Sequence, residues 1–114
     1  MVVHKIQIKA LSVNLAWMGR RFKTQAYKDY EQELSLLLPN KGKFKHINWT
    51  EQLEFILEVG YSNKNADVDN FLKPFLDVCQ NKYLFNDNKI YKLVVEKKIV
   101  KKGCEYIRFS INNI

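Results

Sequence analysis

The hydrophobic pattern of residues 53–100 changes period twice, and this constrains the fold more than any other feature of the sequence. Large apolar side chains alternate with other residues from Leu53 to Gly60, which is typical of a strand with one buried face. From Asp69 to about Tyr83 apolar residues recur at helical spacing. Residues 90–100 are rich in β-branched side chains, which favours a strand again. This segment therefore predicts a strand, a helix and a strand.

Proline positions and a turn signal limit where these elements begin and end. Pro74 lacks the amide hydrogen that a helix interior needs, so the second helix should be capped near Asp69 or Asn70. Residues 101–103 can turn the chain from residues 90–100 into a last strand at 105–111. These last two strands are predicted to form a hairpin.

One strand and one helix are predicted before residue 53. Residues 5–10 alternate polar and apolar side chains, as a half-buried strand does. Thr24 is a typical helix cap, and Pro39 ends the helix after about Leu38. We expect one stripe of this helix to face the core: Ala26, Tyr27, Tyr30, Leu34 and Leu37.

With 114 residues and 13.6 kDa, the chain has room for one domain, which we expect to span residues 1–114. The predicted order of elements is β-α-β-α-β-β. Such an order favours a small mixed sheet with two helices on one side, an α/β or α+β fold.

The chain is basic, with a net charge of +7 and a pI near 9.4. An excess of lysine and arginine favours a polyanionic partner, and nucleic acid is the first candidate. No apolar run approaches the roughly 20 residues of a membrane span, and the N-terminus turns polar too early for a signal peptide. We therefore expect a cytoplasmic protein without a membrane partner.

Two aspartates stand close together where the predicted second strand leads into the second helix. One of Asp67 and Asp69 is readily explained as a helix cap, but two carboxylates so close repel each other unless a cation holds them. Mg²⁺ accepts one or two carboxylates with waters and substrate phosphate. Asp87 lies in a later polar turn, and an antiparallel return of the chain would bring it beside Asp67.

Lys73 stands four residues after Asp69 and four before Asp77, so a helix would place all three on one face. One interpretation is a surface ion-pair ladder worth a few tenths of a kcal/mol per pair. Beside a metal, the same lysine could stabilise charge that builds on a phosphate in the transition state.

These residues resemble the RusA family of Holliday-junction resolvases, small endonucleases common in prophages. Residues 67–77, Asp-Val-Asp-Asn-Phe-Leu-Lys-Pro-Phe-Leu-Asp, are similar to the family's Asp-x-Asp-Asn-x-x-Lys-x-x-x-Asp, and residues 86–90 to its later acidic turn. Upstream, Ser12 to Asn14 and Gly19 to Tyr27 resemble the family's N-terminal loop and first helix. Many relatives have two acids where this chain has Asn86 and Asp87.

The resemblance implies a Mg²⁺-dependent endodeoxyribonuclease, with Mn²⁺ as the alternative cation, that acts in DNA recombination and repair. Asp67, Asp69 and Asp87 would hold the metal, and Lys73 would be the catalytic lysine. It also implies a homodimer whose two active sites cut a four-way junction symmetrically. The candidate residues for DNA contact are Asn14, Arg20, Arg21, Lys41, Lys43, Lys45 and Lys64.

Two other functions remain open at the level of sequence. Asp87 with Glu96 and Lys98 matches the active-site pattern of restriction-nuclease-like enzymes, although charged alternation on an exposed strand often produces Glu-x-Lys. A non-catalytic nucleic-acid-binding module would keep the basic surface and use the acids only as caps. Metal dependence separates the module from both nucleases.

Overall fold

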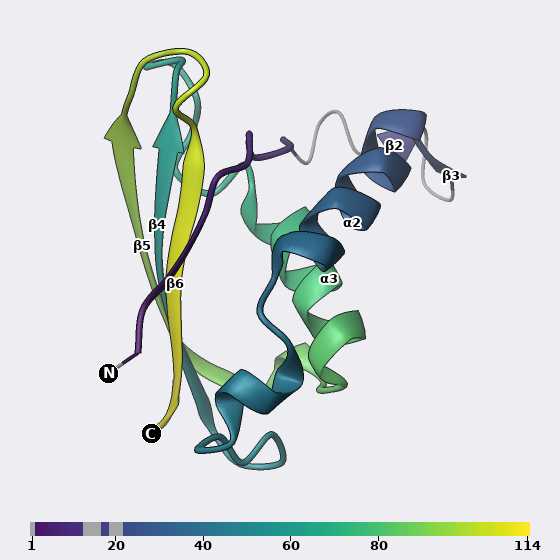
Figure 1. Cartoon of the computed structure of the whole chain (residues 1–114), viewed down its shortest axis with the longest axis vertical. Helices are drawn as coiled ribbons and strands as arrows, with labels where there is room; N and C mark the ends of the chain where they lie inside the picture. The colour runs from purple at the N-terminus through teal and green to yellow at the C-terminus, as the bar shows by residue number, and fades with distance from the viewer. Residues whose placement is uncertain (1, 13–16, 19–21) are drawn as a thin grey trace.

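The computed structural model describes residues 2–12, 17–18 and 22–114. Figure 1 shows the elements in chain order: β1 (His4–Ile6), β2 (Trp17–Met18), β3 (Phe22–Lys23), α2 (Gln25–Leu37), the 3-10 helix η1 (Lys41–Phe44), β4 (Leu53–Tyr61), α3 (Leu72–Tyr83), the 3-10 helix η2 (Asp87–Lys89), β5 (Ile90–Ile99) and β6 (Tyr106–Asn113). Among the described residues, no helix combines the length and apolar character needed to cross a bilayer.

Four strands form one mixed sheet in the order β1-β6-β4-β5, and β2 pairs with β3 separately. β4 and β5 run parallel, with Leu53 opposite Ile90 and Tyr61 opposite Ile99, and α3 connects them. β6 is antiparallel to both of its neighbours, β4 and β1. The predicted class, a mixed sheet with two helices in an α+β fold, is confirmed.

The predicted hairpin of the last two strands is wrong, because β4 lies between β5 and β6. β4 has the strongest apolar alternation, and its Leu53, Phe55 and Val59 are fully buried. A strand of this kind gains most from neighbours on both sides. β5 is rich in exposed charged residues and occupies the edge, where such residues are tolerated.

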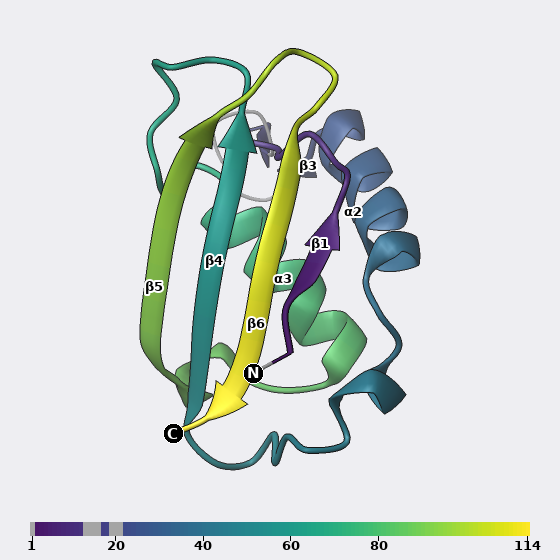
Figure 2. The same cartoon turned by 60° about the vertical axis from the view of Figure 1, so that its left-hand side comes forward.

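Both helices lie on the same face of the sheet (Figures 1 and 2), and the core fills the space between. α2 starts as predicted, because the Thr24 hydroxyl accepts a hydrogen bond from the amide of Tyr27 (3.1 Å). The predicted set of core-facing residues on α2 is partly wrong. Tyr27, Tyr30 and Leu34 are buried, but Ala26 and Leu37 are exposed.

α3 begins at Leu72, and its cap residue, Phe71, lies one to two residues after the predicted cap near Asp69 or Asn70. Pro74 therefore falls in the first turn, where a missing amide hydrogen leaves no bond unmade. The first predicted strand is also shorter than expected, since only residues 4–6 pair with β6, although Ile8 is buried.

A close approach on the open face of the sheet restricts Gly60. A Cβ at this position would overlap the ring of Tyr106 on the adjacent strand β6. That ring is held in place, since its hydroxyl donates to the Glu58 carboxylate (2.7 Å) and the Lys5 ammonium lies 4.5 Å from its centroid.

We predict that Gly60→Ala lowers the free energy of unfolding by about 1–3 kcal/mol, because the ring must leave its contacts. Gly42→Ala is the matched control, since a Cβ at Gly42 meets no heavy atom within 4 Å. The control should stay within about 0.5 kcal/mol of wild type. Urea unfolding measures both, and equal midpoints for the two variants would contradict the packing described here.

Candidate active site

Asp67 and Asp69 lie in the loop between β4 and α3, at the end of the sheet where β4 finishes. Residues 67–72 make successive tight turns. The amide of Asn70 donates to the carbonyl of Asp67 (3.2 Å), and the amide of Leu72 donates to the carbonyl of Asp69 (3.1 Å). Both aspartates are exposed. We call residues 67–70 the acid turn.

The two carboxylates of the acid turn do not cap α3. The cap residue, Phe71, offers no side-chain hydrogen bond to the free amides of the first helical turn. Neither Asp67 nor Asp69 has a side-chain hydrogen bond or an ion pair with any described residue. Helix capping therefore explains neither carboxylate, and both keep their oxygens available.

Tyr61 is the last residue of β4, and the acid turn follows it by six residues. Burial raises the pKa of its hydroxyl to about 12, and the negative charges of Asp69 and Asp67 act in the same direction. The acid turn itself supplies two hard oxygen donors, a donor type that suits Mg²⁺.

A lysine from β5 holds the loop before the acid turn in place. Lys97 donates from its ammonium to the carbonyls of Lys64 (3.2 Å) and Ala66 (2.9 Å). Its strand position pairs with buried Val59, so it stands on the helix-covered face of the sheet. A charged residue at an inward position of a strand is the signal that sequence analysis could have used to find it.

A second set of hydrogen bonds joins this loop to the turn between β5 and β6. The Ser62 hydroxyl donates to one oxygen of the Glu105 carboxylate (2.8 Å), and the amide of Gly103 donates to the other (2.7 Å). The hydrogen bond from Ser62 is the main cause of a lowered pKa for Glu105. The turn also carries Lys101 and Lys102, both exposed, which the search for DNA contacts missed.

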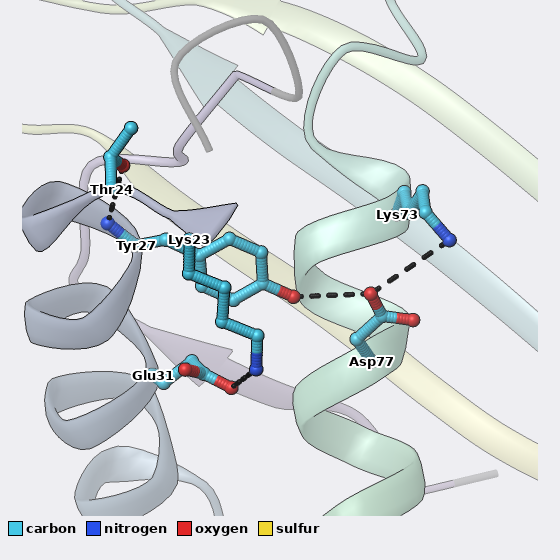
Figure 3. A network of polar contacts seen from close by, with 6 residues as sticks. All are labelled: Lys23, Thr24, Tyr27, Glu31, Lys73 and Asp77. Carbon is cyan, nitrogen blue, oxygen red and sulfur yellow. Dashed lines mark hydrogen bonds and ion pairs between the residues drawn. The ribbon is translucent and has the colours of Figure 1, made fainter. Parts of the chain in front are cut away.

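Lys73 lies in the first turn of α3, and its side chain is 63% exposed. Its ammonium is 4.0 Å from the Asp77 carboxylate, which also accepts a hydrogen bond from the Tyr27 hydroxyl (3.1 Å) (Figure 3). The predicted helical ladder to Asp69 does not form, because Asp69 precedes the helix. Within residues 2–12, 17–18 and 22–114, Lys73 thus has one weak partner, and it lies three residues after the acid turn.

Asp87 does not join the other two aspartates within one chain. The parallel pairing of β4 and β5 places the start of β5, and η2 before it, at the opposite end of the sheet. The amide of Asp87 donates to the Gln80 side chain (3.1 Å), and the helical rise from Leu72 to Gln80 alone is about 12 Å. The expected antiparallel return beside Asp67 is therefore wrong. Among the described residues, no three acidic, histidine or cysteine side chains form a metal-binding group.

Asn86, where the resemblance leads one to expect a second acid, has a structural role. Its side chain accepts a hydrogen bond from the amide of Asn88 (3.0 Å) and caps η2. Asp87 itself is exposed. This turn therefore exposes the carboxylate of Asp87, and the side-chain amide of Asn86 fixes the shape of the turn.

The alternative nuclease-like site is also not assembled within one chain. Glu96 and Lys98 form an exposed ion pair with each other (3.2 Å). The strand from Ile90 to Glu96 already spans about 20 Å, and Asp87 lies before it.

The candidate DNA contacts that the structure describes lie in two places. Lys64 is exposed in the loop that precedes the acid turn. The lysines at 41, 43 and 45 are exposed in and after η1, near the start of β4 and therefore away from the acid turn. Asn14, Arg20 and Arg21 lie outside the described residues.

Comparison with known proteins identifies a family for most of the chain. Residues 13–108 match the family described as Endodeoxyribonuclease RusA. The chain belongs to the RusA endodeoxyribonuclease family. No curated protein matches it individually. Membership in the family suggests an endodeoxyribonuclease, a hydrolase that acts on DNA.

We predict that Lys73→Ala lowers the rate of DNA cleavage by about 10² to 10³, the scale of one lost electrostatic contact in a transition state. Single-turnover cleavage with saturating enzyme measures this step apart from affinity. Lys28→Ala, which removes an exposed lysine from α2, is the control and should cleave normally. A rate for Lys73→Ala within about threefold of wild type would leave it only the ion pair with Asp77.

Proposed function

We propose that this RusA-family chain is a divalent-metal-dependent endodeoxyribonuclease that resolves four-way DNA junctions in recombination and repair. The observation that carries the proposal is the pair of exposed carboxylates at Asp67 and Asp69, which have no side-chain partner among the described residues, in a chain of net charge +7. In such a basic chain, two adjacent unpaired acids are best explained by a cation that holds them. The proposal includes a cytoplasmic location, with which a DNA substrate is consistent.

The side chains around the acid turn have distinct roles in phosphodiester hydrolysis. Asp67 and Asp69 would hold Mg²⁺, or Mn²⁺ as the alternative. When bound, the cation supplies charge neutralisation at the phosphate and at the leaving 3′ oxygen. Lys73 stabilises the additional charge on the phosphate as water attacks it. Lys64, Lys101 and Lys102 hold the flanking phosphates by their charge.

A second copy of the chain would complete the site. β5 is the edge of the sheet and exposes apolar side chains at Tyr91 (64%), Leu93 (41%) and Ile99 (52%). Such an edge tends to pair with another strand. Antiparallel pairing of two β5 strands about a two-fold axis would bring the start of one strand beside the end of the other.

That pairing brings Asp87 toward the acid turn of the other copy. Asp87 precedes the start of β5, while Lys97 anchors the loop of the acid turn near the end of β5. Each site would then consist of Asp67 and Asp69 from one copy and Asp87 from the second. The two sites share the near two-fold symmetry of a four-way junction and make paired symmetric cuts.

The metal site is tested with Asp69→Asn on a synthetic four-way junction and a linear duplex, each with and without Mg²⁺. We expect wild type to cut the junction only with Mg²⁺. The variant should lose cleavage yet bind the junction as tightly or more tightly, because it repels phosphate less. Glu96→Gln is the matched control and should cleave normally. Binding without cleavage by wild type would favour a non-catalytic module instead.

The composite site is tested by mixing two inactive variants, Asp69→Asn and Asp87→Asn, and purifying the heterodimer through two different tags. If Asp87 acts on the other copy, the heterodimer contains one intact site and one doubly altered site. It should therefore nick the junction on one strand, whereas each homodimer stays inactive. A silent heterodimer, or an active Asp87→Asn homodimer, would overturn the composite arrangement.

A further inference from the structure

A cavity of about 500 Å³ lies beside the acid turn. Its walls come from three parts of the chain that meet at one end of the sheet: the segment 9–12 after β1, the start of α2 and the loop between β4 and α3. Figure 2 shows these parts together at the upper end of the sheet. Ala66 and Asn70, which flank the two aspartates, both line the cavity.

Two buried tyrosine hydroxyls, those of Tyr30 and Tyr61, belong to residues that line the cavity. Tyr30 is 5% exposed, and neither hydroxyl has a side-chain hydrogen-bond partner in the described part of the chain. The backbone of Leu11 interacts with the Tyr30 hydroxyl and that of Phe71 with the Tyr61 hydroxyl, and each interaction lowers the pKa of its phenol. Burial has the larger effect and raises the pKa of Tyr30 above its ordinary value, so the phenol keeps its proton and remains a donor. A buried donor of this kind calls for an acceptor, which a ligand in the cavity would supply.

The charges on the lining exclude an anion as that ligand. Asp29, Glu33 and Glu105 line the cavity with Lys9 as the only basic residue among the lining residues described. A phosphate would meet net repulsion there. A neutral, planar ligand with donors and acceptors on its edge fits the phenol hydroxyls and the amide of Asn63.

We propose that this cavity receives the unstacked base of a nucleotide next to the scissile phosphate. The inference rests on the proposed nuclease function, since it assigns the neighbouring acid turn to the phosphate. Ala66 and Asn70 join the two sites, because both line the cavity and directly flank the segment that carries the two carboxylates. A nucleotide with its phosphate at the acid turn therefore has its base within reach of the two phenols.

Base capture would also make the enzyme selective for branched DNA. Extruding a base requires unstacking and unpairing, and this is easiest where pairing is already disturbed, as at the branch point of a junction. In a linear duplex the same base stays stacked. The cavity then stays unfilled, and the neighbouring phosphate is not held at the acid turn.

Photo-crosslinking tests the occupant directly. A four-way junction that carries 5-iodouracil next to the cleavage position is bound to the Asp69→Asn variant, and the complex is irradiated. The peptide that becomes attached to the DNA is then identified by mass spectrometry. We expect attachment at Tyr30 or Tyr61, and little attachment from the same sequence in a linear duplex. Attachment only outside the cavity would overturn the proposal and leave the cavity to water.

A substitution that fills the cavity with a larger side chain provides the second test. Ala26 is an exposed residue of α2 that lines the cavity, and Leu36 is exposed on the same helix away from it. Ala26→Phe should reduce the single-turnover rate on the junction by about tenfold or more, as misplaced substrates do, and abolish the crosslink. Leu36→Phe is the control and should preserve both. An unchanged rate and crosslink in folded Ala26→Phe would contradict the proposal.

The two readouts separate the cavity from the nuclease function. Crosslinking does not need cleavage, so attachment in the cavity without any cleavage by wild type would reject the nuclease and keep the base site. Mg²⁺-dependent junction cleavage without attachment in the cavity would reject the base site and keep the nuclease.

Discussion

The parallel pairing of β4 with β5 is the constraint on which the rest of the structure depends. Because the two strands run in the same direction, the chain must return along α3, and the loops at either end of that helix lie at opposite ends of the sheet. The acid turn follows β4 at one end, and Asp87 precedes β5 at the other. This topology separates Asp87 from Asp67 and Asp69, which is why the proposed site takes its third carboxylate from a second copy of the chain.

Two sets of hydrogen bonds hold the exposed loop between β4 and α3 in place. Lys97 fixes the segment before the acid turn to β5, and Glu105 ties Ser62 to the turn that carries Lys101 and Lys102. Charge-assisted hydrogen bonds of this kind are stronger than neutral ones. They hold carboxylates and lysines at one end of the sheet, where a phosphate would meet both. The cavity lined by Tyr61 lies at the same end of the sheet.

Local signals predicted the elements well, while their pairing was beyond the sequence. Alternation located β4, and the Thr24 cap located the start of α2, because both depend on nearby residues. The hairpin failed since a turn signal at 101–103 does not reveal that β4 separates β5 from β6. The acid turn followed from its motif. Lys97, Glu105 and the two phenols did not, because their roles arise from contacts between segments distant in sequence.

The central claim, that the acid turn is the metal site, is tested most directly by iron-mediated cleavage of the protein itself. Fe²⁺ replaces Mg²⁺ in oxygen-ligand sites, and with ascorbate and peroxide it generates radicals that cut the nearest backbone. The account predicts cuts beside residues 67–69 and beside residue 87, both suppressed by excess Mg²⁺. Asp69→Asn should lose both sets of cuts. Cuts elsewhere, or a chain that stays intact at residues 67–69, would contradict it.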